Sequence, residues 1–319
     1  MNLLEEREYY KPFVYPWAFE KYKKQQQMHW LPDEVPLQDD IKDYNQKLSA
    51  DERLLIDNIF RFFTQADVDV CCGYAKHYLP TFKQPEIRMM LVSFAAMEAV
   101  HQEAYSLLLE TLGKSDDMYQ EFFDIQAMSD KHDYLTDFSM ETKHDIAKTM
   151  AVYSGFTEGV QLFSSFAILL NYPRHNLMKG MGQIVTRSIR DESLHVEGLS
   201  ELFRTFMREN PELWTDKLKY EIYCAAERTV ELEDNFIDVC FNKVTVPDLT
   251  AREVKEYIRY IADRRLLGLG MKAIFKSTVN PLPWIDMQVN AVEHTNFFEN
   301  RATEYAKAST QGNWQDVFK

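Results

Sequence analysis

Three Glu-x-x-His pairs are the residues of this chain with the clearest chemistry, because a helix places residues three apart on one face. One pair lies in a long apolar run, MMLVSFAAMEAVHQEAYSLLL, and another in an amphipathic segment, whereas the third lies in the charged string METKHDIAK. A carboxylate among apolar side chains costs several kcal/mol unless something neutralises it, and a metal ion can do so on a bundle helix. The pairs are, in that order, Glu98/His101, Glu192/His195 and Glu141/His144. We expect metal at the first two and a solvated helix start at the third.

One further acidic residue precedes each of these two pairs at the interval of a helix, a turn and a second helix. Asp67 lies 31 residues before Glu98, and Glu158 lies 34 residues before Glu192. The chain therefore repeats a carboxylate helix followed by a Glu-x-x-His helix, which is the ligand set of a dinuclear site in a four-helix bundle. Four carboxylates would balance two divalent ions. The predicted ligands are Asp67, Glu98, His101, Glu158, Glu192 and His195.

The first two helices that must position these ligands have clear boundaries. Ser49 and Glu52 form a capping box, and the helix that they open is expected to run past the first ligand to Pro80. Pro85 suits the first turn of the next helix and Gly113 its C-terminal end. These limits bracket the long apolar run.

The third ligand helix is expected to run from about residue 141 to just before Pro173. Gly155 and Gly159 flank Glu158 inside it, and each interior glycine costs about 1 kcal/mol relative to alanine. Two interpretations stay open. The glycines permit close helix packing, or they mark a locally deformed helix that lets Glu158 change its metal coordination.

Gly180 and Gly182 predict a break before the fourth ligand helix, which Asn210 and Pro211 should close. Two amphipathic helices, at about 211–240 and 250–267, carry no clustered ligands and are expected to be scaffold.

The remaining segments are expected to be less regular. Residues 1–48 contain four prolines and predict an extended lead-in with a short helix near 18–28. Residues 114–140 predict a short helix with loops, and the chain should become irregular from Asn280.

Composition limits the class of protein. Only 10 Gly, with 14 Met and 13% aromatic residues among 319, indicate a large helical core, and no linker divides the chain. The net charge of −14 argues against nucleic acid or an anionic membrane as partner. We find no signal peptide and no apolar stretch long enough to span a bilayer. The cysteines lack a CxxC pair and predict reduced thiols in the cytoplasm; they are Cys71, Cys72, Cys224 and Cys240.

The six ligands in this order, with Tyr105 four residues after His101 and the string RDESLH, resemble the small, radical-generating subunit of class I ribonucleotide reductase. The similarity covers nearly the whole chain. It implies an all-α, ferritin-like helical bundle with a dinuclear metal site in a four-helix core and extra flanking helices, over residues 1–300. It assigns one metal to Asp67, Glu98 and His101, and the other to Glu158, Glu192 and His195.

The resemblance also implies roles for residues outside the ligand set. Tyr105 would bear the radical, and Asp191 would orient the first histidine ligand. Trp30 would lie on the electron-transfer route, and Tyr305 would pass the radical to the large subunit. Ser188 is polar where many relatives are aliphatic, so the pocket around the radical is expected to be less dry than usual. The side chains expected to shelter that pocket are Phe94, Leu162 and Phe166.

The function implied is that of the small subunit of ribonucleoside-diphosphate reductase. Two iron ions per chain in an oxo-bridged centre, with manganese as the alternative, would activate O2 and generate a tyrosyl radical. The large subunit would use this radical to reduce ribonucleotides to 2′-deoxyribonucleotides for DNA synthesis. A homodimer is expected, with no direct binding to nucleic acid or membrane.

The C-terminal residues 301–319 are polar with isolated aromatic residues, and they hold too little apolar surface to fold alone. A frayed end is the ordinary interpretation, but the resemblance favours a flexible tail that docks on the large subunit.

Three other classes of protein remain as alternatives. A ferritin-like iron store or ferroxidase would need neither Tyr105 nor a docking tail. A substrate-oxidising diiron protein would need a deep apolar channel beside the metals. A purely structural bundle would not need six metal-type ligands in two repeats.

Overall fold

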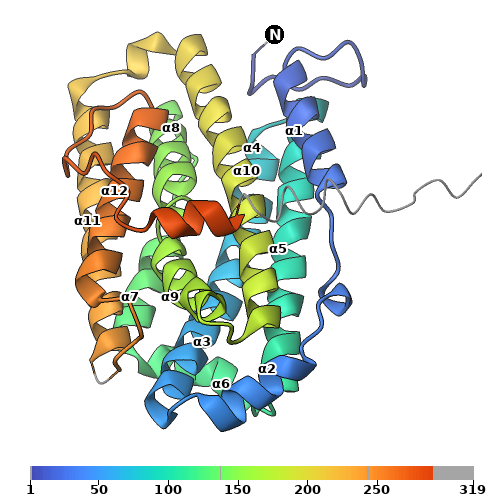
Figure 1. The fold of residues 1–319 in the computed structure, drawn as a ribbon. Coiled ribbons are helices and arrows are strands. Elements are labelled where there is room, and N and C mark those ends of the chain that lie inside the picture. Colours follow the sequence, from blue (N-terminus) through green and yellow to red (C-terminus); the bar gives the residue numbers. More distant parts are fainter. Residues whose placement is uncertain (1, 137, 243, 290–319) are drawn as a thin grey trace, which may run out of the picture.

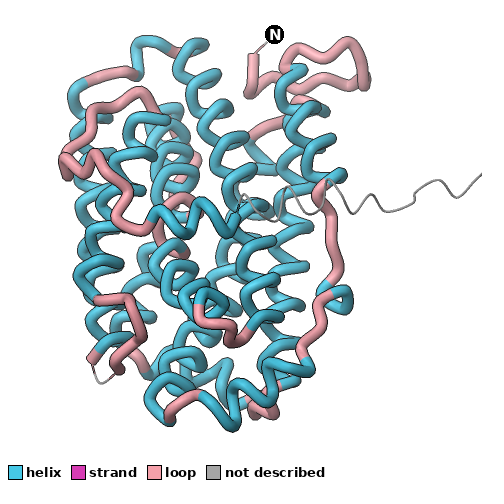
Figure 2. Tube along the Cα trace, viewed as in Figure 1, coloured by secondary structure: helices cyan, strands magenta, loops and turns pink. Residues whose placement is uncertain are grey.

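The computed structural model describes residues 2–136, 138–242 and 244–289. Helices joined by short loops make up nearly all of this part of the chain, and Figure 2 shows no strand in it. The single extended pairing among these residues is an isolated bridge between Val246 and Leu249. The predicted all-α class is thus confirmed.

Four helices carry the predicted ligands. They are α3 (Ala50–Gly73), α5 (Pro85–Thr111), α8 (Lys143–Val152) with its extension, and α10 (Lys179–Glu209). α3 packs along α5, and α10 contacts both α5 and α8. In Figure 1 these helices run side by side through the middle of the molecule.

Within the described ranges, five further helices flank this core. α1 (Pro16–Gln27) packs on α5, and α9 (Phe163–Arg174) packs on α10. α11 (Asp216–Phe241) and α12 (Ala251–Gly268) pack on each other at the far side of α8 and α9 (Figure 1). α7 (Gln126–Thr136) closes the end between α3 and α11.

The boundaries of the first two ligand helices are those expected from their caps. The Ser49 hydroxyl accepts from the Glu52 amide, and the Glu52 carboxylate accepts from the Ser49 amide. Pro85 occupies the first turn of α5, where its missing N–H removes no hydrogen bond. Gly113 follows α5 with φ +74°, a conformation that glycine adopts without strain.

The third ligand helix is broken, and it does not stop before Pro173. α8 passes into the π-helical segment η5 (Tyr153–Thr157), residues 158–162 form turns, and α9 then includes Pro173. A proline removes one backbone donor, and α9 ends one residue later, so the loss is confined to its last turn. The segment is both closely packed and deformed, since a Cβ on Gly155 would lie 2.9 Å from Leu269 within the π-helical stretch. A change of metal coordination by Glu158 stays a prediction.

The expected break at Gly180 and Gly182 is wrong, because both residues lie inside α10. The chain turns just before them, where Met178 has φ 51°. The glycines instead permit close packing. A Cβ on Gly180 would lie 2.6 Å from the Pro36 carbonyl oxygen, and one on Gly182 would lie 2.4 Å from Pro173.

Other segments are more helical than expected. Residues 283–289 form a helix where irregular chain was predicted, because the buried side chains of Leu282 and Ile285 fix its start on the core. Residues 114–140 contain two short α-helices rather than one. The remaining short elements are η1 (Pro32–Glu34), α2 (Gln38–Lys42), η2 (Asp43–Lys47), η3 (Tyr74–Tyr78), α4 (Leu79–Thr81), α6 (Asp117–Gln120), η4 (Glu121–Asp124) and η6 (Pro211–Leu213).

None of the helices in the described ranges combines the length and the apolar character needed to cross a membrane.

Candidate metal centre

The six predicted ligands converge in the middle of the bundle as two groups that share one residue. In each group one nitrogen or carboxylate oxygen per residue lies within 4.8 Å of all the others, and all six side chains are buried. The groups are Asp67, Glu98, His101 and Glu192, and Glu158, Glu192 and His195. The sequence assigned Glu192 to the second metal alone, whereas its carboxylate belongs to both groups.

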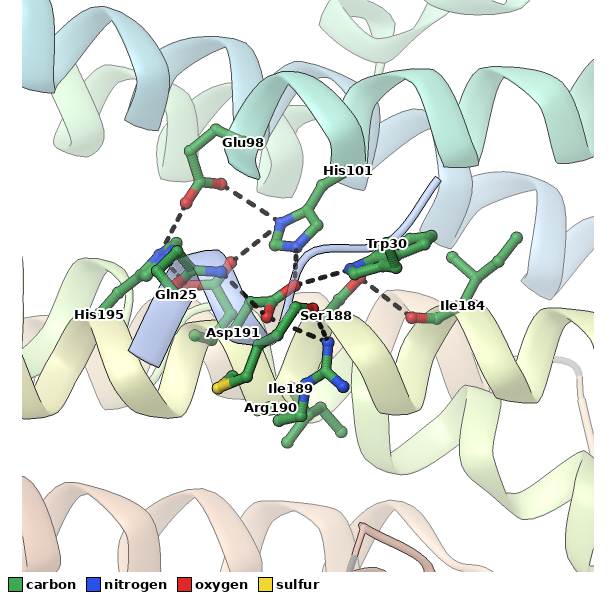
Figure 3. Close-up of polar contacts among 12 residues, drawn as sticks. Gln25, Trp30, Glu98, His101, Ile184, Ser188, Ile189, Arg190, Asp191 and His195 are labelled. Atoms are coloured by element: carbon green, nitrogen blue, oxygen red, sulfur yellow. Dashed lines mark hydrogen bonds and ion pairs between the residues drawn. The ribbon is translucent and has the colours of Figure 1, made fainter. Parts of the chain in front are cut away.

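Glu98 and Glu192 each reach both histidines. Glu98 Oε1 lies 2.9 Å from His195 Nδ1, and Glu98 Oε2 lies 3.5 Å from His101 Nδ1. Glu192 Oε1 lies 3.4 Å from His101 Nδ1, and its Oε2 lies 3.8 Å from His195 Nδ1. Figure 3 shows Glu98 and His101 extending from α5 toward His195 on α10. Two carboxylates placed between two imidazoles have the arrangement needed to bridge a pair of ions.

The oxygen atoms of this cluster fit a pair of cations. Both carboxylate oxygens of Glu98, Glu158 and Glu192 are buried without a well-oriented hydrogen bond from any residue that the structure describes. Buried polar atoms are nearly always hydrogen-bonded, so such a concentration of unsatisfied acceptors needs explanation. Two divalent ions would satisfy these oxygens and offset the four carboxylate charges.

Burial and the two histidines shift the pKa values of the carboxylates in opposite directions. Burial raises the pKa of Asp67 and of Glu158 well above the usual range. Burial acts in the same direction on Glu98, but the two histidines outweigh it and lower the pKa of Glu98 to about 2. Glu192 also faces both histidines, yet burial and the neighbouring Glu98 charge raise its pKa, so only one of the two carboxylates between the histidines is strongly acidic.

Asp191 is placed to fix the orientation of His101. His101 Nε2 lies 3.2 Å from Asp191 Oδ2, so Nδ1 of the same ring faces the ligand groups (Figure 3). Trp30 Nε1 donates to the same Oδ2 at 2.8 Å, and Gln25 Nε2 donates to Oδ1 at 3.3 Å. Arg190 Nη2 lies 3.5 Å from Oδ1. Trp30, Asp191 and His101 thus form one buried hydrogen-bonded chain that ends at the ligands.

Gln25 was missed in the sequence, and no local signal marks it. It lies on α1, 166 residues from Asp191, and only the packing of α1 against α10 brings the two together. Arg190 stands next to Asp191 and could have been found from that position.

Tyr105 is buried beside the first ligand group, and its hydroxyl has a defined partner. It donates to Ser188 Oγ at 3.0 Å. The Ser188 hydroxyl donates in turn to the Ile184 carbonyl oxygen at 3.1 Å (Figure 3). The Phe63 ring stacks on Tyr105 with centroids 4.7 Å apart, and Phe60 lies at 6.1 Å. Burial, together with the Asp67 carboxylate, raises the pKa of Tyr105.

The aromatic wall around Tyr105 differs from the expected one. Phe94 lies eleven residues before Tyr105 on α5, about 16 Å along the helix axis, and its ring packs on His195 at 4.4 Å. The expectation that it shelters Tyr105 is therefore wrong. Phe166 stacks on Phe63 at 5.1 Å and so supports the wall from behind, and Leu162 is buried. Phe60 and Phe63 were missed, although both share a helical face with Asp67.

The remaining sequence expectations divide clearly. Glu141 is exposed, His144 pairs with Glu221 at 2.6 Å, and neither is in the two ligand groups found among the described residues. Cys71 and Cys72 are free thiols. Tyr305 and the tail 301–319 lie outside the described residues.

Comparison with known proteins agrees with this arrangement. Residues 7–281 match the family described as ribonucleotide reductase, small chain. Over the full chain and 99% of the relative, the sequence is 46% identical to the probable ribonucleoside-diphosphate reductase small subunit 376L of Invertebrate iridescent virus 6.

Two solved structures have a similar fold. The ribonucleotide reductase R2 subunit from Clostridium botulinum is 22% identical, with a TM-score of 0.80 over 86% of this chain and 88% of that one. The dimanganese(II)-NrdF of Streptococcus sanguinis is 23% identical, with a TM-score of 0.76 over 88% of this chain and 99% of that one.

Proposed function

Because this chain belongs to the ribonucleotide reductase small-chain family and is a ribonucleoside-diphosphate reductase small subunit, we propose that its buried carboxylate and histidine cluster binds two metal ions and generates a radical. The observation that carries the proposal is the set of unsatisfied carboxylate oxygens between two oriented histidines. Six residues would hold the ions, and they are Asp67, Glu98, His101, Glu158, Glu192 and His195.

We propose iron as the metal, with manganese as the alternative. Both accept carboxylate and imidazole ligands, so the donor set does not favour one over the other. The Streptococcus sanguinis protein, whose name gives two manganese ions, supports keeping the alternative.

The metal pair, when bound, supplies the electrons that reduce O2 and then the oxidising power to take one electron from a phenol. Tyr105 is the proposed donor, because its ring lies beside Asp67 and His101 inside an aromatic wall. This wall keeps water and thiols from the ring, which would otherwise quench a radical. Ser188 holds the hydroxyl in one orientation.

Trp30 is proposed as the next residue on the electron-transfer route, because its indole N–H and His101 Nε2 both contact Asp191 Oδ2. Asp191 acts here as a positioning residue for both rings. Tyr305 and the tail 301–319 are proposed to connect this route to the large subunit, which reduces the ribonucleotide.

We further propose a homodimer in a reducing compartment such as the cytoplasm. Val68 on α3 and Val92 on α5 are exposed on neighbouring helices and offer apolar surface for a second copy. All four cysteines are free, as expected for reduced thiols. Light scattering at micromolar concentration should give the mass of two chains.

The features described above favour this function over the alternatives. An iron store has no use for a hydrogen-bonded Trp30–Asp191–His101 chain or for a sheltered phenol. Cavities of 480 and 670 Å3 among the described residues are lined by none of the six proposed ligands, so they give no support to a substrate channel beside the metals.

The test is metal analysis of three variants reconstituted with Fe(II) in air, and in parallel with Mn(II). Glu98→Ala and Glu192→Ala should each lower the bound metal, because each removes a carboxylate shared by both histidines. Glu141→Ala, the matched Glu-x-x-His control outside the groups, should bind as much metal as the unmodified protein. Undiminished metal in both of the first two variants would refute the assignment.

A further inference from the structure

A second set of buried phenols lies beside the ligand groups and has no part in the proposed function. Tyr74 and Tyr78 lie on η3, and Tyr153 lies on η5. Their ring centroids are 5.8 Å apart for Tyr74 and Tyr78, 5.7 Å for Tyr74 and Tyr153, and 5.2 Å for Tyr78 and Tyr153. All three side chains are almost completely buried. We call them the tyrosine cluster.

Tyr74 joins this cluster to the ligands. Its ring meets the His195 ring edge-to-face at 6.4 Å. Its hydroxyl faces the Glu158 carboxylate, and burial together with that carboxylate raises the pKa of Tyr74. Tyr105 instead lies near Asp67 and His101, whose charges act on the pKa of its hydroxyl. Each ligand group therefore has one phenol beside it.

Core packing alone explains the rings of the cluster but not all of its hydroxyls. The Tyr78 hydroxyl is buried and forms no well-oriented hydrogen bond with the residues described, and the buried Tyr74 hydroxyl faces a carboxylate, that of Glu158. A buried polar group without a partner destabilises the fold, and phenylalanine would fill the same space without that cost. Tyr153 differs, because its hydroxyl donates to the Val70 carbonyl.

The backbone around the cluster is also unusual. Both η3 and η5 are π-helical, and such segments occur frequently at functional sites. Gly73 lies directly before η3, where a Cβ would come within 2.4 Å of the Tyr153 hydroxyl oxygen. The three rings can therefore lie together next to Glu158 only with irregular helix at η3 and η5 and with no side chain at residue 73.

We propose that Tyr74 is a second redox-active tyrosine of this chain, which gives an electron to the oxidised metal centre when Tyr105 cannot. The inference rests on the proposed function, because O2 must first oxidise the centre. One electron passes from the Tyr74 phenol to the centre, the phenol O–H bond breaks, and the proton moves to the facing Glu158 carboxylate. The products are a neutral Tyr74 phenoxyl radical and a centre reduced by one electron.

Tyr78 and Tyr153 enclose this radical as Phe60 and Phe63 enclose Tyr105. Because these neighbours are phenols, which can themselves be oxidised, the Tyr74 radical should be shorter-lived than the Tyr105 radical. Tyr74 would in this way reduce the oxidised metal centre by one electron when Tyr105, the normal electron donor, cannot do so.

The experiment is rapid-freeze EPR of the full chain after Fe(II)-loaded protein is mixed with O2. Tyr105→Phe should give a transient tyrosyl signal, which narrows when the protein contains ring-deuterated tyrosine. Tyr105→Phe/Tyr74→Phe should lose this signal. Tyr105→Phe/Tyr172→Phe is the matched control and should keep it, because Tyr172 is also buried with an unpaired hydroxyl but lies on α9.

Metal content and thermal unfolding of the two double variants are compared with those of Tyr105→Phe, and they should match, because each second substitution removes only one further phenol hydroxyl. If the unmodified protein shows its Tyr105 radical while Tyr105→Phe shows no tyrosyl signal, the inference is overturned and the proposed function stands. A transient tyrosyl signal that persists in Tyr105→Phe/Tyr74→Phe also overturns the inference. If the iron-loaded, unmodified protein forms no tyrosyl radical at all, both the proposed function and this inference are refuted.

Discussion

Ser188→Ala tests the immediate environment of Tyr105 through a single hydroxyl. The substitution removes the acceptor of the buried Tyr105 hydroxyl, for which no other hydrogen bond is found among the described residues. A buried donor left unpaired costs about 1–3 kcal/mol. Alanine is the better helix former on α10 by about 0.5 kcal/mol. The metal-free protein should therefore lose about 1–2 kcal/mol in its free energy of unfolding.

A double-mutant cycle in urea separates this hydrogen bond from general effects on α10. In a Tyr105→Phe background no phenol needs an acceptor, so Ser188→Ala should change the unfolding free energy by less than about 0.5 kcal/mol. The coupling energy should then be about 1–2 kcal/mol, as for residues in contact. Ser193→Ala is the matched control. The Ser193 hydroxyl donates to the carbonyl four residues earlier, as that of Ser188 does, but it makes no bond to Tyr105.

The same variant has a spectroscopic consequence in the loaded protein. Once Tyr105 has lost its proton, the Ser188 hydroxyl can rotate and donate a hydrogen bond to the phenoxyl oxygen. The EPR signal of the radical should then show one proton hyperfine coupling that disappears when the solvent is D2O. Ser188→Ala should abolish that coupling while a radical still forms. Equal destabilisation by Ser188→Ala in both backgrounds, with the exchangeable coupling retained, would refute this account of the pocket.

Three further predictions concern the radical, the protons and the tail. Tyr105→Phe should bind metal and consume O2 but lack the long-lived tyrosyl signal, and a persisting long-lived signal by EPR would move the radical elsewhere. Because burial raises the pKa of Asp67 and of Glu158, their protons are lost only as pH rises through those raised values, so metal must displace them. Calorimetry in buffers of different ionisation enthalpy should show proton release on Fe(II) or Mn(II) binding and weaker binding at lower pH, and binding that does not depend on pH would contradict this. Removing residues 313–319 should leave the Tyr105 radical intact and abolish binding to the large subunit, whereas Tyr305→Phe should bind normally without nucleotide reduction; unchanged affinity of the truncated protein would exclude docking through the tail.

Much of the ligand set could be predicted because its signal is local. Residues three apart on a helix share a face whatever the rest of the chain does, so Glu98 and His101 are paired by the backbone alone. The cap at Ser49 and the proline at Pro85 act within one turn, and the structure has both where the sequence predicted them. The repeat of a carboxylate helix and a Glu-x-x-His helix was then enough to predict a bundle with two ligand groups.

Packing between distant helices decided what the sequence could not. Glu192 contacts both histidines only because α10 lies against α5 at one particular depth, and a small shift along either helix would separate them. The hydrogen bond from Gln25 to Asp191 joins two helices that are 166 residues apart in the chain. Phe94 was misplaced for a different, local reason, since eleven residues on one helix already put it about 16 Å from Tyr105 along the axis.

The glycines and prolines show the same division in the backbone. Gly180 and Gly182 were predicted to break the helix because glycine weakens an isolated helix. Both lie within α10, at positions where a neighbouring segment occupies the space that a side chain would fill. Pro173 lies inside α9 against Gly182 for the same reason. The sequence by itself determined the helical class and the ligand types, which depend on interactions within a few turns. Tertiary structure alone decided the shared carboxylate, the partners of Asp191 and Tyr105, the end of α9 and the start of α10, which depend on contacts between segments distant in the chain.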